Sequence, residues 1–321
     1  MCTTDLEMSI YNEIDCKVEV SGSTTLPVKF LFNQIAKAAE GEITVSIDEN
    51  ERAEIRAGSA CYKLNGMKAC EFPVLPKDDE AFVYTLDQKL LKDMLRKVSY
   101  ASSQDDTRRT LKGVLMSFKD GKLTMVATDG RRLALIENEV EFPVSYERDI
   151  VLPSKAVTEI QRSLEEEGEI KIYAQQTQIC FEKGSIKIYS KLIDDVYPNY
   201  QQVIPKETVE HVEIDRQLLL DALDRASVMT MDEAHSTRLI FEPGKLTVTS
   251  AANDIGEAKD EVPIKYAGER IEIVFNPNYV MDPLKAIDDD EITFNLNNGH
   301  SPAIITCSVP FIYVLMPLRV N

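Results

Sequence analysis

The side chains that could do acid–base chemistry gather in two short acidic runs, Asp194-Asp195 and residues 288–290. Neighbouring carboxylates can act as general acid and base. Neither run has a companion histidine, and the chain shows no nucleophile motif and no glycine-rich phosphate loop. We interpret residues 288–290, like the acidic run 165–167, as solvated turns between a helix and a strand. An enzyme of unknown type remains an alternative, and the primary expectation is no catalytic activity.

The cysteines and histidines predict no metal site and no cofactor. The six cysteines contain no CxxC pair, and the three histidines lie far apart in sequence. Without paired ligands at short spacing, neither a zinc ribbon nor a redox motif is indicated. We therefore expect reduced cysteines that pack as small apolar side chains.

Charge and hydropathy bound the class of protein. The 321 residues are 44% hydrophobic and 28% charged, with a formal net charge of −18. No apolar run approaches membrane-spanning length, so we expect a cytoplasmic protein without a membrane partner. An evenly spread negative charge would argue against nucleic acid, because phosphate binding needs positive surface. That conclusion fails if the basic residues gather on one face.

A long internal repeat organises the chain. One pattern, a turn with an apolar helical run and then a strand, recurs at residues 25–45, 151–172 and 274–294. Its glutamates Glu42, Glu169 and Glu291 stand 127 and 122 residues apart. A second pattern of strand, helix and strand precedes two of the three, at residues 84–125 and 212–248. Periods this long indicate repeated domains, and the chain begins partway through the first.

The repeat predicts α+β domains with antiparallel sheets covered on one face by helices. Pro27, Pro153 and Asn276 mark helix starts, and residues 43–47, 170–173 and 186–189 alternate as half-buried strands do. Proline-bearing segments close the first two units. We expect three domains: 1–79, which is incomplete, 80–208 and 209–321.

One predicted helix separates apolar from basic side chains. In the helix that begins at Gln88, Leu91, Met94, Leu95 and Val98 share one face, and three basic residues lie on another: Lys89, Lys92 and Arg96. If the domains close into a ring with such helices inside, the basic side chains face a central channel. Such a channel could hold DNA by its phosphates without reading sequence.

Several collinear motifs resemble the bacterial DNA polymerase III β sliding clamp family. Residues 127–134, ATDGRRLA, are similar to its ATDG-x-RLA motif, and residues 313–319, YVLMPLR, to its carboxy-terminal tail. Further matches lie at residues 4–8, 107–108, 111–114, 190–192, 197–200 and 275–280. They follow one another in family order over the whole chain.

The resemblance implies a non-catalytic processivity factor. It implies a head-to-tail homodimeric ring of six similar domains, with sheets outside and helices lining a channel around duplex DNA. Its partners would be the DNA polymerase III catalytic subunit, the clamp loader, and other polymerases and repair proteins that carry clamp-binding peptides. The location implied is the cytoplasm, on the nucleoid. A clamp-like interaction module that no longer closes a ring is the other alternative.

Three sets of site residues are carried over from the family by position. The cleft between the second and third domains would bind partner peptides through Leu111, Thr128, Gly130, Arg132, Leu133, Pro198, Val203, Asn276, Tyr279, Pro302, Val314, Met316, Pro317 and Leu318. Apolar walls would bury an anchor while Thr128, Arg132 and backbone groups orient it. DNA would be contacted by Lys92, Gln104, Arg108 and Arg109.

The third set is the joint between subunits, Phe32, Tyr62, Val228, Met229 and Glu257. By the family pattern about forty residues are absent before Met1, and they belong to the domain that forms this joint. We therefore expect weak ring closure and an intact peptide cleft.

Overall fold

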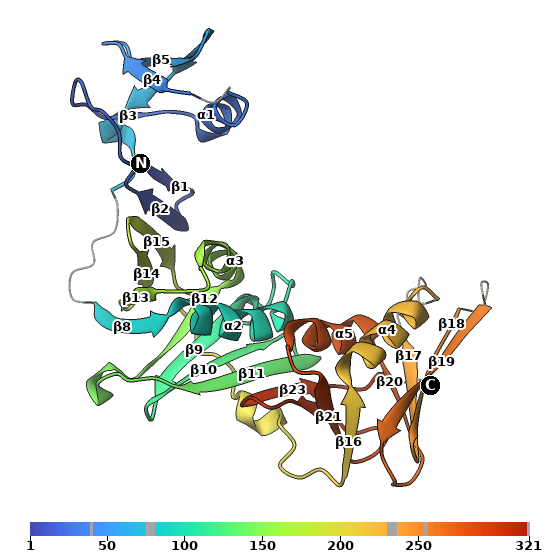
Figure 1. Ribbon diagram of the computed structural model, residues 1–321. Coiled ribbons are helices and arrows are strands. Elements are labelled where there is room, and N and C mark those ends of the chain that lie inside the picture. Colours follow the sequence, from blue (N-terminus) through green and yellow to red (C-terminus); the bar gives the residue numbers. More distant parts are fainter. Residues whose placement is uncertain (39–40, 75–80, 230–235, 253–255, 320–321) are drawn as a thin grey trace. The chain divides into compact units, whose positions relative to one another are not determined.

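The structure is a computed structural model that describes residues 1–38, 41–74, 81–229, 236–252 and 256–319. The chain divides into two compact units. The first contains residues 1–81 and 180–190, and the second contains residues 82–179 and 191–321 (Figure 1). No helix in the described ranges is long and apolar enough to cross a membrane.

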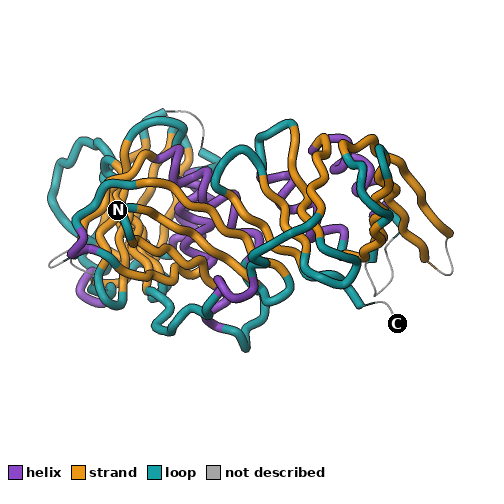
Figure 2. Tube along the Cα trace, turned by 90° about the horizontal axis from the view of Figure 1, so that it is seen from below, coloured by secondary structure: helices purple, strands orange, loops and turns teal. Residues whose placement is uncertain are grey.

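The second unit is built on a continuous antiparallel sheet of twelve strands among its described residues. In spatial order they are β12 (Arg148–Pro153), β9 (Gly113–Lys119), β10 (Lys122–Thr128), β11 (Arg132–Glu139), β23 (Phe311–Leu315), β22 (Ala303–Thr306), β21 (Glu291–Leu296), β16 (Glu210–Asp215), β19 (Gly256–Lys265), β18 (Lys245–Ala252), β17 (Thr237–Glu242) and β20 (Ile271–Phe275). Figure 2 shows these strands side by side along the unit. Strands β8 (Phe82–Asp87) and β13 (Glu169–Ala174) pair separately, and β14 (Gln178–Lys183) spans the division between the units.

Four α-helices accompany these strands: α2 (Gln88–Val98), α3 (Ser154–Ser163), α4 (Arg216–Ser227) and α5 (Pro277–Ala286). Short 3₁₀ turns complete the unit: η2 (Ser99–Ala101), η3 (Arg109–Lys112), η4 (Val144–Tyr146) and η5 (Tyr200–Val203). The two copies of the strand–helix pattern begin alike. Asp87 accepts a hydrogen bond from the Leu90 amide at 3.0 Å, and Asp215 accepts one from the Leu218 amide at 2.8 Å. Both carboxylates cap a helix amino terminus, where they satisfy a free amide and oppose the helix dipole.

The strand β11 meets β23 at the centre of the sheet, which joins segments far apart in sequence. The register pairs Leu133 with Val314 and Leu135 with Ile312. Alternate residues of a strand point to opposite faces, so the junction has two distinct sides. Arg132, Ala134 and Tyr313 point to what we call the helix face, where α2 and α5 lie, while Leu133, Leu135 and Val314 point to the outer face. Figure 1 shows the helices on one side of the sheet and η5 on the other.

The described residues of the first unit form short strands and one α-helix. Strands β4 (Ile43–Ile47), β5 (Arg52–Ala57) and β6 (Ala60–Asn65) form one antiparallel sheet, β3 (Thr24–Thr25) pairs with β7 (Met67–Lys68), and β2 (Met8–Asn12) pairs with β1 (Cys2–Thr4) and β15 (Ile186–Lys191). The helix is α1 (Val28–Ile35), and η1 (Ala69–Glu71) follows β7. None of the α1 residues is buried. Its apolar side chains Phe30 and Phe32 are exposed.

The predicted helices and strands are confirmed closely where the signal is local. The proline and asparagine starts are the residues that precede α1, α3 and α5, and residues 43–47 form β4. All four apolar residues named for the helix beginning at Gln88 are fully buried. The α+β class with antiparallel sheets is correct.

Two expectations need correction. Cys180 is buried as a small apolar side chain, but Cys16, Cys61 and Cys70 are exposed. Residues 288–290 are more than a solvated turn. The Asp288 carboxylate accepts hydrogen bonds from Arg96, and the Asp289 carboxylate accepts one from the Ser308 amide at 2.6 Å.

Candidate partner-binding site

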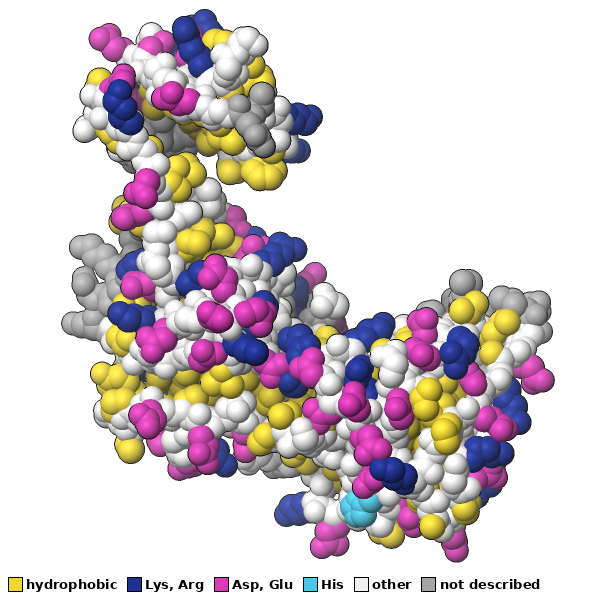
Figure 3. All heavy atoms as spheres, in the orientation of Figure 1, with side chains coloured by type: hydrophobic (Ala, Val, Ile, Leu, Met, Phe, Trp, Pro, Cys, Tyr) yellow, Lys and Arg dark blue, Asp and Glu magenta, His cyan; other side chains and the backbone are white. Residues whose placement is uncertain are grey.

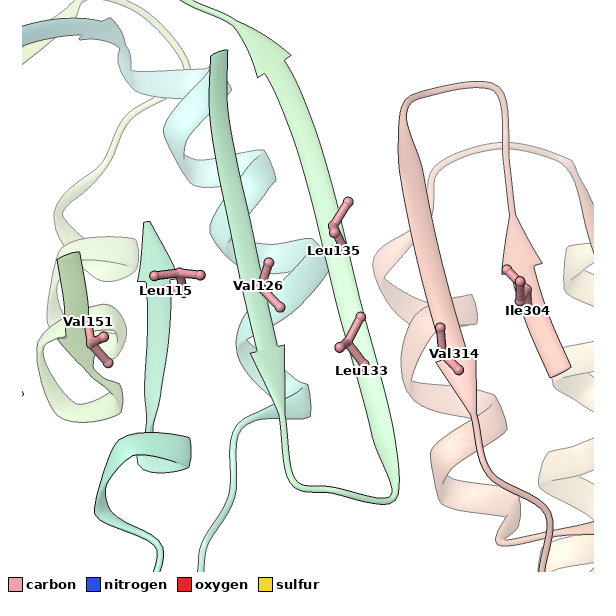
Figure 4. Packing of buried hydrophobic residues seen from close by; sticks show 7 residues of the cluster. All are labelled: Leu115, Val126, Leu133, Leu135, Val151, Ile304 and Val314. Carbon is pink, nitrogen blue, oxygen red and sulfur yellow. The ribbon is translucent and has the colours of Figure 1, made fainter. Parts of the chain in front are cut away.

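The outer face of the β11–β23 junction carries a cluster of apolar side chains. Its buried members lie in rows across the strands of the sheet (Figure 4), namely Leu115, Val126, Leu133, Leu135, Val151, Ile304 and Val314. Leu133 and Val314 face each other in register and are each only 2% exposed. We call this set the outer cluster. It provides a preformed apolar floor, which is the usual basis of a ligand site.

The segment 193–204 covers part of the outer cluster. Ile193, Tyr197, Tyr200 and Ile204 pack against it and are themselves half-buried. Burial raises the pKa of the Tyr197 phenol well above its ordinary value, so this group is neutral at physiological pH. The neighbouring Val203 remains exposed. Accessible apolar surface therefore lies beside the buried floor.

A tight loop between β10 and β11 forms one rim. The Thr128 hydroxyl donates to the Arg132 carbonyl at 2.6 Å and accepts from the Gly130 amide at 3.1 Å. The Asp129 carboxylate accepts from the Arg131 amide at 2.8 Å. Gly130 has φ of 85°, the left-handed region in which a side chain is strained. These bonds fix the loop, and the ATDG sequence is what the turn requires.

On the helix face, Arg132 is held by charges and rings. Its Nε donates to Asp129 at 3.1 Å, its Nη2 donates to the Tyr100 carbonyl at 2.7 Å, and its Nη1 donates to Asp282. The guanidinium lies 4.3 Å from the centre of the Tyr279 ring. With a side chain only 9% exposed, Arg132 is committed to contacts within the unit. These contacts hold β11 in position.

Two further contacts tie the carboxy-terminal tail to the rim. The Met316 amide donates to the Arg131 carbonyl at 3.0 Å, and the Leu318 amide donates to the Val274 carbonyl at 2.8 Å. Met316 is 44% exposed. It follows β23 directly, and its amide bond to Arg131 continues the pairing with β11, so we expect its side chain on the side of Val314 as an accessible wall of the outer cluster.

All fourteen predicted cleft residues lie in the second unit, but on two sides of the sheet. Thr128, Leu133, Val314 and Met316 are on the outer face or its rim. Asn276 caps α5 and Tyr279 lies under Arg132, so both belong to the helix face. Gly130 lies in the loop between β10 and β11, and Arg132 is on the helix face. The other six are accessible to varying degrees: Leu111 in η3 is half-buried, Pro198 and Val203 are exposed beside the cover, and Pro302, Pro317 and Leu318 flank the strands.

The sequence pattern does not predict a charged cluster between α2 and the segment that follows α5. The Lys97 ammonium, 4% exposed, lies 2.5 Å from the Asp93 carboxylate and 3.6 Å from that of Asp288. Arg96 donates to Asp288 at 2.9 Å. These hydrogen bonds hold the pKa of Asp288 below its ordinary value. The signal for Lys97 was its spacing of three from Met94 on the buried face, which a count of basic residues overlooks.

The predicted DNA contacts differ in their surroundings. The Lys92 ammonium lies 2.6 Å from the Glu166 carboxylate. In the loop 104–109, Gln104 and Arg109 are exposed. Arg108 donates to the Asp129 carbonyl at 3.2 Å and lies 3.7 Å from the Asp105 carboxylate. In Figure 3, basic and acidic side chains are interspersed over the visible face of the second unit. Lys92 and Arg108 would each exchange a carboxylate or carbonyl for a phosphate.

The predicted interface residues carry accessible apolar surface. Phe32 on α1 is 67% exposed, and Val228, directly after α4, is also exposed. Tyr62 and Met229 are half-buried, and Glu257 is exposed.

Within the described ranges there is no group of three or more His, Cys, Asp and Glu side chains that could hold a metal ion. The hydrogen bond from the Thr110 hydroxyl lowers the pKa of Asp195, the opposite of what a general acid needs.

Family models match the chain in three consecutive parts. Residues 1–76 match the N-terminal domain of the DNA polymerase III beta subunit, residues 85–199 match the central domain, and residues 201–319 match the C-terminal domain. The β11–β23 junction is therefore where the second matched part meets the third.

Individual proteins agree with this. The beta sliding clamp of Chlamydia trachomatis is 36% identical over 99% of this chain and 76% of its own length, and that of Caulobacter vibrioides is 32% identical over 99% and 88%. Among solved structures, a sliding clamp from Bartonella birtlesii bound to griselimycin has a TM-score of 0.94 at 33% identity, covering 99% of this chain and 88% of its own. One from Bacillus subtilis has a TM-score of 0.94 at 26% identity, covering 100% and 88%. The chain therefore belongs to the DNA polymerase III beta subunit family, the sliding clamps that serve as polymerase processivity factors, and it has their three-domain α+β fold.

Proposed function

We propose that this sliding clamp tethers replication and repair proteins to DNA by binding their peptides on the outer face of the β11–β23 junction. The observation that carries the proposal is the outer cluster. It is apolar and preformed, and the accessible apolar side chains of Val203 and Met316 adjoin it in the chain. An apolar anchor of a partner peptide would bury itself between Leu133, Val314 and the accessible Met316.

The fourteen cleft residues divide their work in this proposal. Those on the outer face and rim contact the peptide. Those on the helix face, Arg132, Asn276 and Tyr279, hold β11 and α5 in position. A ligand complex of a similar clamp supports a binding site in this family, since the Bartonella birtlesii protein is bound to griselimycin.

We propose further that two copies form a head-to-tail ring around duplex DNA that closes weakly, with domains at 1–79, 80–208 and 209–321. Accessible apolar side chains at Phe32 and Val228 suit a joint between copies. Lys92, Gln104, Arg108 and Arg109 would contact phosphates without reading sequence. The partners would be the polymerase III catalytic subunit, the clamp loader and repair proteins, in the cytoplasm on the nucleoid. The chain would perform no chemistry of its own.

Topological retention tests the clamp function. The purified chain, loaded by its organism's clamp loader onto a nicked circular plasmid, should co-elute with that plasmid in gel filtration. Cutting the plasmid once should release it, because a ring slides off a free end. Equal retention on circular and linear DNA would contradict encirclement and favour ordinary phosphate binding.

Peptide binding is tested separately. The probe, here called the polymerase peptide, is a synthetic copy of the clamp-binding segment of the polymerase III catalytic subunit from the same organism. Calorimetry should show one site per chain, and griselimycin should compete for it. Failure of both ligands to bind would overturn the assignment of the cleft.

A further inference from the structure

A cavity lies on the outer face beside the outer cluster. Its volume is about 380 Å³, within the range of roughly 300–1,000 Å³ that is usual for ligand pockets. Leu135, Tyr200, Ile204 and Ile312 line it, and the same four residues belong to the outer cluster or pack against it. We call it the accessory pocket. It continues the floor of the cleft away from Leu133 and Met316, and none of the fourteen cleft residues lines it.

The pocket lies at the end of the β11–β23 pairing. Their register runs from Arg132 paired with Leu315 to Ile136 paired with Phe311. Beyond it, the chain before β23 bends at Val309-Pro310, where the Phe311 amide donates to the Val309 carbonyl at 2.6 Å. The Glu137 amide then donates to the Pro310 carbonyl at 3.1 Å. Val309 and Pro310 of this bend line the pocket, together with Thr306 and Cys307 from the end of β22.

An apolar row and an acidic row of side chains meet at this pocket. On the outer face, Val151, Leu115, Val126 and Leu135 lie side by side across four strands and continue to Ile312 on β23. Further along the strands, the parallel row is Asp149, Ser117, Thr124 and Glu137. The apolar row ends at the floor of the pocket, and the acidic row ends at its wall.

Glu137 gives the wall a negative charge that is only loosely compensated. One carboxylate oxygen accepts from the Thr124 hydroxyl at 3.2 Å, and the other lies 3.7 Å from the Lys122 ammonium. The side chain is 39% exposed. Burial, and after it the nearby Glu137 carboxylate, raises the pKa of Tyr200, which places the charge close to that ring. A cation would find a partner here.

We propose that the accessory pocket binds the flank of a partner's clamp-binding peptide, taking one large apolar side chain with an adjacent Lys or Arg that pairs with Glu137. This rests on the proposed function, since it needs the core peptide to occupy the cleft. The continuity of the two apolar floors supports a single chain spanning both. The negative wall selects a basic neighbour, and a second acidic flank would be repelled.

Extended peptides test the proposal. The polymerase peptide is compared with versions that add Gly-Gly-Leu-Lys at one end or the other, and each has a matched Gly-Gly-Ser-Ser control. One Leu-Lys version should bind about 5-fold more tightly than its control. Glu137→Gln should reduce that gain to about 2-fold. Glu242→Gln should leave the gain unchanged, because Glu242 does not line the pocket. It is a matched control, since it is 37% exposed and lies 3.8 Å from a lysine, much as Glu137 does.

Cys307 reports where the flank lies. It lines the pocket, and burial raises the pKa of its thiol, so alkylation is slow at neutral pH and is followed at about pH 8.5 by mass spectrometry. The Leu-Lys peptide that binds more tightly should protect Cys307, and the core peptide should not. Cys307→Phe, which fills the pocket, should abolish the gain and leave core binding intact.

The outcomes separate the two proposals. Equal binding of Leu-Lys and Ser-Ser versions at both ends, with Cys307 alkylated at the same rate, would overturn the accessory pocket and leave the cleft standing. No binding of the core peptide would overturn the cleft itself. Tighter binding without protection of Cys307 would place the flank elsewhere and also overturn the accessory pocket.

Discussion

The two faces of the sheet at the β11–β23 junction are built from neighbouring residues but differ in chemistry. On the helix face, Arg132 and Tyr313 are enclosed by partners that satisfy them with charge and hydrogen bonds. On the outer face, Leu133 and Val314 belong to a buried apolar cluster beside which Met316 is accessible. Arg132 and Leu133 are consecutive residues of β11, and they place a fixed charge on one face of the sheet and an apolar side chain on the other.

This difference assigns separate tasks to the two faces. Directional bonds on the helix face fix how the second matched family part meets the third. Non-directional apolar surface on the outer face can accept different peptides, because it demands little geometry. Substitutions on the helix face should therefore change stability first, and accessible substitutions on the outer face should change binding first.

The largest effect is expected for Arg132→Ala. The change leaves Asp129 and Asp282 without their cation in a largely buried site, so the free energy of unfolding should fall by about 3–5 kcal/mol. Urea unfolding followed by circular dichroism measures this. Arg270→Ala, which removes an exposed arginine that also faces two glutamates, is the control and should cost less than about 1 kcal/mol. Equal losses in both variants would remove the distinction between the helix face and ordinary surface.

The next largest effect is expected for Leu133→Ala, which should change both stability and binding because Leu133 is a buried residue of the outer face. Unfolding should become easier by about 2–4 kcal/mol from lost burial and the cavity left behind. The polymerase peptide should also bind more weakly. The control Leu218→Ala, on an exposed leucine of α4, should change neither quantity by more than about 0.5 kcal/mol. Normal peptide affinity in a destabilised Leu133→Ala would show that the outer cluster is only core.

A smaller effect is expected for Tyr313→Phe. The Tyr313 hydroxyl donates to the Tyr279 carbonyl at 2.7 Å in a buried setting, and its loss leaves that carbonyl unpaired. We expect a cost of about 1–2 kcal/mol. Tyr266→Phe removes a similar bond to the Glu269 carbonyl at 2.6 Å that is exposed to water, so thermal unfolding should show almost no change. If both variants behave alike, burial of the helix face contributes nothing to that bond.

The smallest effect concerns pH. The hydrogen bonds from Arg96 lower the folded-state pKa of Asp288, so its contribution is present above the unfolded value and is lost as pH falls through the folded one. Because the Asp288 side chain is 66% exposed, that contribution should be at most about 1 kcal/mol. Asp288→Asn should therefore be slightly less stable than the parent at about pH 7 and equal to it near pH 2. A difference that persists at the acidic end would point to packing as its source.

The parts of the fold predicted from sequence are those set by neighbouring residues. The helix starts at Pro153 and Asn276 and the strand at residues 43–47 are local signals, and all three are confirmed. The expected alternation of burial in residues 43–47 is wrong, because residues 44–47 are all exposed. The repeat predicts the α+β class, because each copy contains both strands and a helix. Both copies of the strand–helix pattern also begin their helix with an aspartate cap. These features need no knowledge of distant contacts.

The site required more than local signals. Composition does not indicate that Arg132 meets Asp282 across 150 residues, or that Lys97 is buried beside Asp93. The family resemblance places Arg132 in the peptide cleft, and the structure adds its contacts with Asp129, Asp282 and Tyr100. Only the family resemblance predicted that Leu133 and Val314 lie in one site. They become neighbours through a strand pairing that no sequence spacing predicts.

The most direct test of the account uses Met316, which lies on the outer face but supports little of the core. In Met316→Ala, calorimetry with the polymerase peptide should show binding weaker by about 1–3 kcal/mol, while the free energy of unfolding stays within about 0.5 kcal/mol of the parent. Met67→Ala, at an exposed methionine of β7, should leave both unchanged. Unchanged peptide affinity in Met316→Ala would contradict the claim that partners bind on the outer face.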